Sequence, residues 1–199
     1  MPRKYDLKRR AERQDETRIR IVDATVALHK EIGPARTTIK AIAERAGVER
    51  LTVYRHFPDE GLLFGACGAR FREKHPPPDP GVWVAEIDPV ARVRLALTGL
   101  YAWYADNESM IANAERDAEL LPALRAARAP FAQYQEAVAA ILARGWGRDD
   151  DAMMRLAAAR LAIDFHSWRS LVQRQALPVQ AAIELMVTLI ASAGIDRTR

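Results

Sequence analysis

A segment near the N-terminus, residues 37–57, has the residue types and spacing of two short helices joined by a tight turn. Ala43 is small enough to let two helices approach closely. Gly47 follows four residues later, where a backbone without Cβ can adopt a positive φ. Val53 then returns an apolar side chain to the shared core. This spacing is typical of a helix-turn-helix, whose second helix enters the major groove of DNA, so the predicted chemistry is recognition of double-stranded DNA.

The distribution of charge favours the same kind of partner. The chain carries a net charge of +4, yet residues 1–57 contain 14 Lys/Arg and 8 Asp/Glu, whereas residues 58–199 contain 16 and 18. The basic excess therefore lies entirely in the segment with the helix-turn-helix, as expected of a DNA-binding domain on a neutral body. Residues 1–15 are predicted to form a mobile basic arm that reaches DNA phosphates or a minor groove; a disordered terminus without a role fits equally well.

Several classes of site are disfavoured by composition. The single cysteine, Cys67, excludes an intrachain disulfide and a thiolate metal cluster, and it favours a reducing, cytoplasmic location. Its apolar surroundings suggest a buried structural thiol rather than a nucleophile. The four histidines are far apart in sequence and the glycines are dispersed, so no metal-ligand pattern or phosphate-binding loop is seen. We expect a protein that is not an enzyme, has no catalytic residues, cofactor or metal, and has no membrane span or signal peptide.

Periodicity predicts helices along the whole chain and no strands. The first helix covers about 15–32 and ends at Gly33-Pro34; Thr38 caps the second, and the recognition helix covers about 49–57. Three consecutive prolines, residues 76–78, cannot continue a helix. They suggest a DNA-binding domain over 1–75 and a helical ligand-binding and dimerisation domain over 76–199. Further helices are predicted at about 89–106, 108–119, 122–144, 150–175 and 178–194, with the aspartates at 149–151 beginning one of them.

With these residues in view, the N-terminal part resembles the TetR family of bacterial transcriptional regulators over roughly residues 17–65. The resemblance rests on Thr38-Ile39, Ala43, Gly47-Val48 and the block Tyr54-Arg55-His56-Phe57. It implies an all-α homodimer with a three-helix DNA-binding domain, a ligand pocket in the C-terminal domain, and repression that is relieved by a small-molecule effector.

The resemblance also implies roles for individual residues. Arg50 and Thr52 would face the major groove, Leu51 could contact a thymine methyl, and Tyr54 would bind a backbone phosphate. Glu49 stands where a Ser or Thr usually caps the recognition helix, and Glu60 replaces a frequent phosphate-binding Lys. The predicted DNA-binding set is Thr38, Glu49, Arg50, Leu51, Thr52, Tyr54, Arg55 and His56.

The C-terminal part is rich in aromatic side chains, which suit a pocket for an apolar or aromatic ligand but are equally common in an ordinary helical core. The candidate ligand-binding set is Trp103, Tyr104, Met110, Asn113, Phe131, Tyr134, Phe165 and Trp168. The last two predicted helices carry apolar stripes and are the candidate dimer interface.

Together these features predict a ligand-responsive transcriptional regulator, most simply a repressor that binds a palindromic operator as a dimer. The alternative is a helical small-molecule-binding or interaction protein without specific operator binding, which Glu49 and Glu60 favour.

Overall fold

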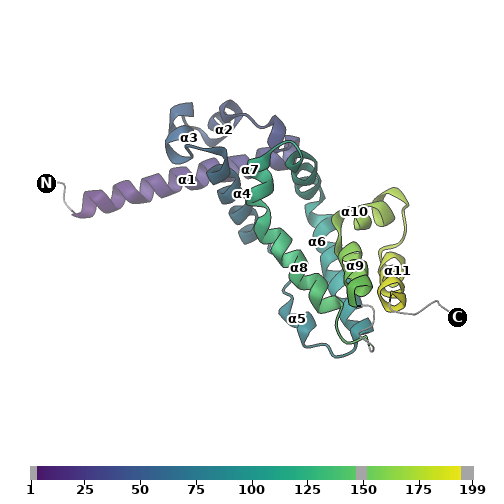
Figure 1. Ribbon diagram of the computed structural model, residues 1–199. Helices are drawn as coiled ribbons and strands as arrows, with labels where there is room; N and C mark the ends of the chain where they lie inside the picture. Colours follow the sequence, from purple (N-terminus) through teal and green to yellow (C-terminus); the bar gives the residue numbers. More distant parts are fainter. Residues whose placement is uncertain (1–3, 147–151, 194–199) are drawn as a thin grey trace. The chain divides into compact units, whose positions relative to one another are not determined.

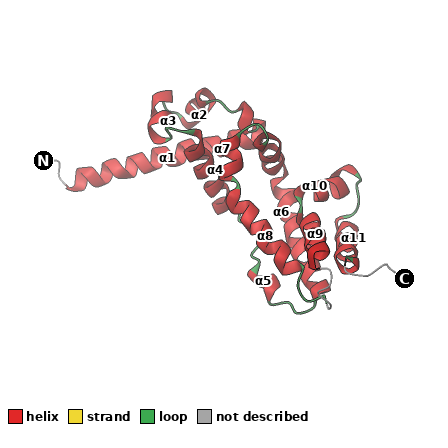
Figure 2. Cartoon of the chain, viewed as in Figure 1, coloured by secondary structure: helices red, strands yellow, loops and turns green. Residues whose placement is uncertain are grey.

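The computed structural model describes residues 4–146 and 152–193, and these residues form helices joined by short loops (Figure 1, Figure 2). No strand occurs within these two ranges, so the predicted all-α fold is confirmed. No helix in the same ranges is both long and apolar enough to cross a membrane. The aspartate run at 149–151 lies outside the described residues. The helices are α1 (Lys4–Ile32), η1 (Pro34–Arg36), α2 (Ile39–Ala46), α3 (Arg50–His56), α4 (Glu60–Lys74), α5 (Gly81–Val84), α6 (Pro89–Ala118), α7 (Pro122–Ala127), α8 (Ala129–Leu142), α9 (Ala152–Ile163), α10 (Phe165–Trp168), η3 (Arg169–Arg174) and α11 (Val179–Ser192).

The chain divides into two compact units. The first unit comprises residues up to 76 together with 108–129, and the second comprises 77–107 and the residues from 130 onward. The first segment of the first unit ends one residue after the predicted boundary at 75, and residues 108–129 join the same unit. The reason is that α6 is one continuous helix, not the two predicted over 89–106 and 108–119. Asn107, between those ranges, donates from Nδ2 to the carbonyl of Trp103 at 2.8 Å and does not interrupt the helix.

The helix predicted over 150–175 is also wrong in its continuity. It is divided into α9, α10 and the π-helical segment η3. Asp164 separates the first two, because its side chain accepts a hydrogen bond from Ser167 N at 2.7 Å and so caps α10. A side-chain cap of this kind begins a new helix even where the apolar period continues.

Helix α1 corrects the prediction of a mobile basic arm. It begins at Lys4, so the described part of the arm is helical. No glycine or proline lies between residues 4 and 32, and arginine, lysine, glutamate and alanine all favour helix. The helix ends where predicted, before Gly33-Pro34.

The core of the first unit is formed by α1–α4. Ile21, Ile42 and Val53 from the first three helices are almost fully buried in one apolar cluster, which also contains Phe57 and Leu63. This cluster fixes the positions of the two short helices, α2 and α3, which could not be stable alone.

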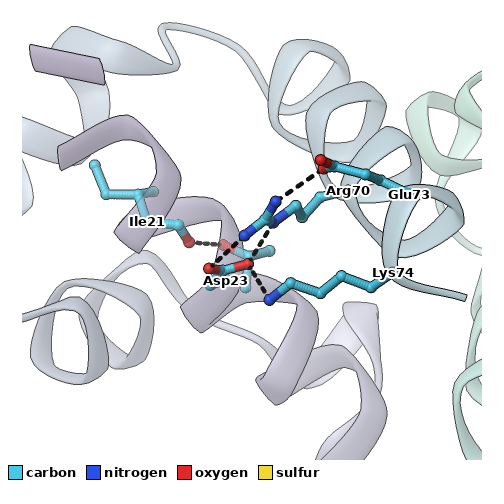
Figure 3. A network of polar contacts seen from close by, with 6 residues as sticks. Ile21, Asp23, Arg70, Glu73 and Lys74 are labelled. Atoms are coloured by element: carbon cyan, nitrogen blue, oxygen red, sulfur yellow. Dashed lines mark hydrogen bonds and ion pairs between the residues drawn. The ribbon is translucent and has the colours of Figure 1, made fainter. Parts of the chain in front are cut away.

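A polar clamp joins α1 to α4 at the surface of this core (Figure 3). The Asp23 carboxylate accepts hydrogen bonds from Arg70 Nε at 2.8 Å and from Lys74 Nζ at 2.9 Å, and Arg70 also pairs with Glu73 at 2.8 Å. The Arg70 guanidinium, followed by the Lys74 ammonium, lowers the pKa of Asp23 to about 2 against the desolvation that opposes it. The clamp holds the helix that carries the N-terminal basic residues against α4.

The second unit has its own core. Leu97 and Leu100 of α6, Leu142 of α8 and Ile183 and Ile190 of α11 are almost fully buried. Helix α9 packs against α11 (Figure 1).

Candidate nucleic-acid interface

The turn between α2 and α3 has the geometry that its sequence predicts. The Thr38 hydroxyl accepts a hydrogen bond from Ala41 N at 3.1 Å and caps α2. Gly47 adopts φ 64° and ψ 44°, in the left-handed region. Val48 N then donates to the carbonyl of Ala43 at 3.0 Å, which satisfies the end of α2. Both predictions are confirmed, and they set the direction in which α3 leaves the turn.

Helix α3 divides its side chains sharply between core and solvent. Val53 is fully buried and Phe57, its C-cap, is 3 % exposed, whereas Leu51 is 78 % exposed and Tyr54 is 52 % exposed. The helix is therefore anchored by two apolar residues and presents the rest of its surface to a partner. Of the predicted DNA-binding residues, Thr38, Glu49, Arg50, Leu51, Tyr54 and Arg55 are exposed, and Thr52 and His56 are half-buried.

Arg18 supports the end of α3 and was not anticipated from the sequence. Its Nη1 donates to the carbonyl of His56 at 3.1 Å, and its guanidinium carbon lies 4.2 Å from the centre of the Phe57 ring. A cation at a helix C-terminus satisfies an unpaired carbonyl and complements the helix dipole. In the sequence, Arg18 precedes the buried Ile21 by one helical turn, so the two residues lie on the same face of α1.

His56 has a pKa below its ordinary value of 6.5, because partial burial and then the nearby Arg55 and Arg18 disfavour its charged form. A neutral imidazole can donate one hydrogen bond to a phosphate without adding charge.

A recess lies beside the end of α3, between it and the N-terminal part of α1. We refer to it as the α1–α3 recess. Its volume is about 320 Å³. The recess forms only because α1 is helical at its N-terminal end, so the sequence pattern of scattered basic residues does not reveal it. It is lined by Arg10, Arg13, Gln14, Thr17, Arg55 and His56.

In the second unit, six of the eight candidate ligand-binding residues form one aromatic cluster. The centre of the Tyr104 ring lies 5.5 Å from that of Phe165 and 5.7 Å from that of Trp168. The ring centres of Trp103 and Phe131 are 5.6 Å apart. Phe131 stacks on Tyr134 at 5.8 Å.

This aromatic cluster is mostly core. Tyr104 and Trp168 are fully buried and Phe165 is 1 % exposed, while Phe131 and Tyr134 are half-buried at its edge. The Tyr104 hydroxyl donates to the carbonyl of Ile163 at 2.5 Å, and burial raises the pKa of this phenol. Trp168 Nε1 is buried and has no hydrogen-bond partner among the residues that the structure describes.

The other two candidates, Met110 and Asn113, belong to the first unit and do not join the aromatic cluster. Asn113 Nδ2 donates to the carbonyls of His29 and Lys30, at 3.0 Å each. Its amide thus caps the end of α1.

The first unit also contains the only cysteine of the chain. Cys67 is 4 % exposed, and its Sγ lies 3.3 Å from His29 Nδ1. Burial raises the pKa of the thiol to about 12 and lowers that of His29 to about 4, so both side chains are neutral at pH 7. The prediction of a buried thiol is confirmed. Across 4–146 and 152–193, no group of three or more His, Cys, Asp or Glu is arranged to hold a metal ion.

Comparison with known proteins agrees with this geometry. Residues 21–67 match the family model described as bacterial regulatory proteins, tetR family. The transcriptional repressor KstR of Mycolicibacterium smegmatis is 44 % identical over 62 residues, which are 31 % of this chain and 30 % of KstR. The regulator TtgR of Pseudomonas putida is 38 % identical over 69 residues, 35 % of this chain and 33 % of TtgR. The chain thus matches about a third of the length of these curated relatives.

The fold extends the similarity over almost the whole chain. A transcriptional regulator from a Rhodococcus species aligns with a TM-score of 0.63 at 19 % identity, covering 92 % of this chain and 99 % of the regulator. FadR from Bacillus subtilis, solved in complex with stearoyl-CoA, aligns with a TM-score of 0.58 at 18 % identity, covering 88 % of this chain and 98 % of FadR.

Proposed function

We propose that this chain is a regulator of the TetR family, a ligand-responsive repressor that binds a palindromic DNA operator as a homodimer. The match of residues 21–67 to the tetR family model and the fold shared with solved transcriptional regulators support this proposal. It would act in the cytoplasm, where bacterial DNA lies. One observation supports this proposal above all others. Helix α3 is held by buried Val53 and Phe57, and it presents Arg50, Leu51 and Tyr54 to solvent on a basic unit.

The predicted DNA-binding residues divide into two roles. Arg50, Leu51 and Thr52 at the beginning of α3 contact base edges, where an arginine pairs with guanine O6 and N7. Thr38, Tyr54 and His56 contact phosphates and fix the register of the helix on the duplex.

The homodimer forms through α9 and α11, the two helices that correspond to the predicted interface. Large apolar side chains on these helices remain exposed in the single chain, and burying them between two copies would be favourable. A dimer also explains how one short recognition helix achieves specificity, because two helices read two half-sites about one helical turn apart. The exposed side chains are Met153, Met154 and Leu161 on α9 and Val179 and Leu185 on α11.

The effector binds in the second unit, beside the aromatic cluster. The half-buried edge formed by Phe131 and Tyr134 offers apolar contacts, and the π-helical segment η3 follows directly after Trp168. Segments of π-helix occur frequently at functional sites. FadR shares this fold and binds stearoyl-CoA, so a ligand with a long apolar part is the first class to examine. Ligand binding would alter the separation of the two recognition helices and release the operator.

Selection of genomic fragments with the purified protein at near-physiological salt, followed by footprinting, tests the proposal. The expected result is a palindrome with half-sites about one or two helical turns apart. Arg50→Ala, which changes a solvent-facing residue, should abolish the enrichment and leave the circular dichroism spectrum unchanged. Absence of enrichment above non-specific binding would overturn the repressor assignment and favour a helical binding protein.

A further inference from the structure

The α1–α3 recess lies on one face of a helix that has two different environments along its length. Arg10, Arg13, Gln14 and Thr17 follow the spacing of one helical face, and the same face continues to the fully buried Ile21. In its second half this face packs on the core of the first unit. In its first half it extends beyond the core and carries cations instead of apolar side chains.

The N-terminal half of α1 extends a helix whose second half is packed, and its residues favour helix without packing on the core. Arg10, Arg13 and Gln14 are exposed there. Thr17 uses its hydroxyl locally, donating to the carbonyl of Arg13 at 2.9 Å. The guanidinium groups of Arg10 and Arg13 are therefore accessible to a partner.

The charge of the recess specifies the partner. Three guanidinium groups, from Arg10, Arg13 and Arg55, line it, and none of its described lining residues is acidic. Like charges around one small space repel each other, and an anion between them removes this repulsion. The planar guanidinium fork matches the oxygens of a phosphate. A volume of about 320 Å³ equals roughly ten liquid waters at about 30 Å³ each, which is enough for a phosphate and its hydration.

We propose that the α1–α3 recess binds a backbone phosphate of duplex DNA, with Arg10 and Arg13 of α1 and Arg55 of α3 around it. The inference rests on the proposed function, because Arg55 and His56 directly follow the exposed Tyr54 on the recognition helix. When α3 lies in the major groove, the recess at its C-terminal end reaches the strand that borders the groove. The N-terminal half of α1 is then a second, sequence-independent DNA contact outside the helix-turn-helix.

The salt dependence of binding to a random-sequence duplex tests this inference. Each neutralised phosphate contributes about −0.9 to the slope of log affinity against log salt concentration. The variant R10A/R13A should reduce the magnitude of the slope by about one and weaken binding roughly tenfold near 100 mM salt. Alanine retains the helix, so the circular dichroism spectrum should be unchanged. A matched control, K30A/R174A, removes two exposed cations elsewhere and should leave the slope as in the original protein.

A third substitution examines whether the residues share one phosphate. If they do, adding Arg55→Ala to R10A/R13A should weaken binding by much less than the product of the separate effects, because contacts to one group are not additive. Independent effects that multiply would contradict a shared phosphate.

The outcomes separate this inference from the proposed function. Failure of the original protein to bind any duplex would overturn the proposed function itself. Normal binding with an unchanged slope in R10A/R13A would overturn only the recess. Thermal unfolding in inorganic phosphate or chloride at equal ionic strength identifies the source of the anion: stabilisation of the original protein by phosphate, with no change in DNA slope, would indicate a free-phosphate site and overturn the assignment to DNA.

Discussion

The two units of this chain use their chemistry-bearing side chains in opposite ways. In the first unit, an aliphatic core anchors α3, and the residues with binding chemistry, such as Arg50 and Tyr54, face solvent. In the second unit, the aromatic residues with binding chemistry, such as Tyr104 and Trp168, are themselves the core. The first unit presents an exposed surface to DNA. In the second unit, a ligand must bind at the edge of the aromatic cluster or displace side chains within it.

Exposed and buried side chains in the two units differ in what they indicate about a partner. Exposed cations beside a recognition helix indicate a partner only where they gather around one space, as Arg10, Arg13 and Arg55 do. Buried aromatic residues already stabilise the fold by packing against each other. They indicate a ligand only where part of the ring remains accessible, as for Phe131 and Tyr134.

The substitution Trp168→Ala gives the largest expected effect and tests whether the cluster is core. Removing a fully buried indole should lower the free energy of unfolding by about 3–5 kcal/mol. Phe131→Ala at the half-buried edge should cost only about 1 kcal/mol, because much less area leaves water there. All four tryptophans, Trp83, Trp103, Trp146 and Trp168, belong to the second unit, so fluorescence during urea unfolding reports on that unit alone.

A small loss in Trp168→Ala, comparable to that of Phe131→Ala, would contradict the core assignment. It would mean that Trp168 lines space that a ligand fills. Trp168→Phe is the control, since it removes the buried Nε1, which no described residue bonds, but retains an aromatic ring.

The same contrast explains what could be predicted from the sequence. The turn at Gly47 and the cap at Thr38 depend on residues within a few positions of each other, and both predictions are confirmed. The hydrogen bonds of Asn113 form because α6 continues into the first unit and reaches the end of α1, and no local sequence pattern reveals this. The α1–α3 recess was missed because the N-terminal basic residues were expected in a mobile arm. The turn and the cap at Thr38 were predictable because Gly and Thr are strongly selected at such positions, whereas the cap by Asp164 and the packing between distant segments were not.

Gly33→Ala should have the next largest effect, on the first unit. Gly33 has φ 90°, which side-chain-bearing residues rarely adopt, and an added Cβ would lie 2.6 Å from Asp117 Oδ2. That carboxylate accepts a hydrogen bond from Ala35 N at 2.8 Å, so it cannot move without loss. We expect a loss of about 2 kcal/mol in the free energy of unfolding, measured by far-ultraviolet circular dichroism.

Gly47→Ala is the matched comparison, because Gly47 also has a positive φ but a Cβ added there would lie 3.9 Å from Arg20 Nη1, an ordinary contact. Its cost should be about 1 kcal/mol, from backbone strain alone. Equal losses in the two variants would show that the contact with Asp117 contributes nothing.

Asp23→Asn tests the clamp between α1 and α4 and should have a smaller effect. The clamp is partly exposed, so we expect a loss of about 1 kcal/mol after allowing for screening by water. The pKa of Asp23 is lowered from 3.8 to about 2, so its stabilising contribution is complete above pH 4 and is lost as the pH falls towards 2. Urea unfolding of the original protein and of Asp23→Asn should therefore differ at pH 6 and converge near pH 2. A constant difference across this range would assign the loss to packing rather than to charge.

Glu49→Ser should have the smallest effect, and it acts on the binding surface rather than on stability. Glu49 is the exposed N-cap of α3, and within the described residues its side chain makes no capping hydrogen bond. Serine removes a carboxylate that would lie near DNA phosphates and adds a hydroxyl that can cap the helix. Non-specific affinity for duplex DNA should rise about threefold at low salt, and the gain should shrink as salt screens the charge.

Glu49→Gln separates the two causes, because it removes the charge without supplying the same cap. If Glu49→Gln gives the full gain, the carboxylate opposes DNA electrostatically, and the original glutamate favours sites where a cytosine amino group can bind it. If neither variant gains affinity, Glu49 lies away from the duplex, and α3 enters the groove at an angle that leaves its first turn outside.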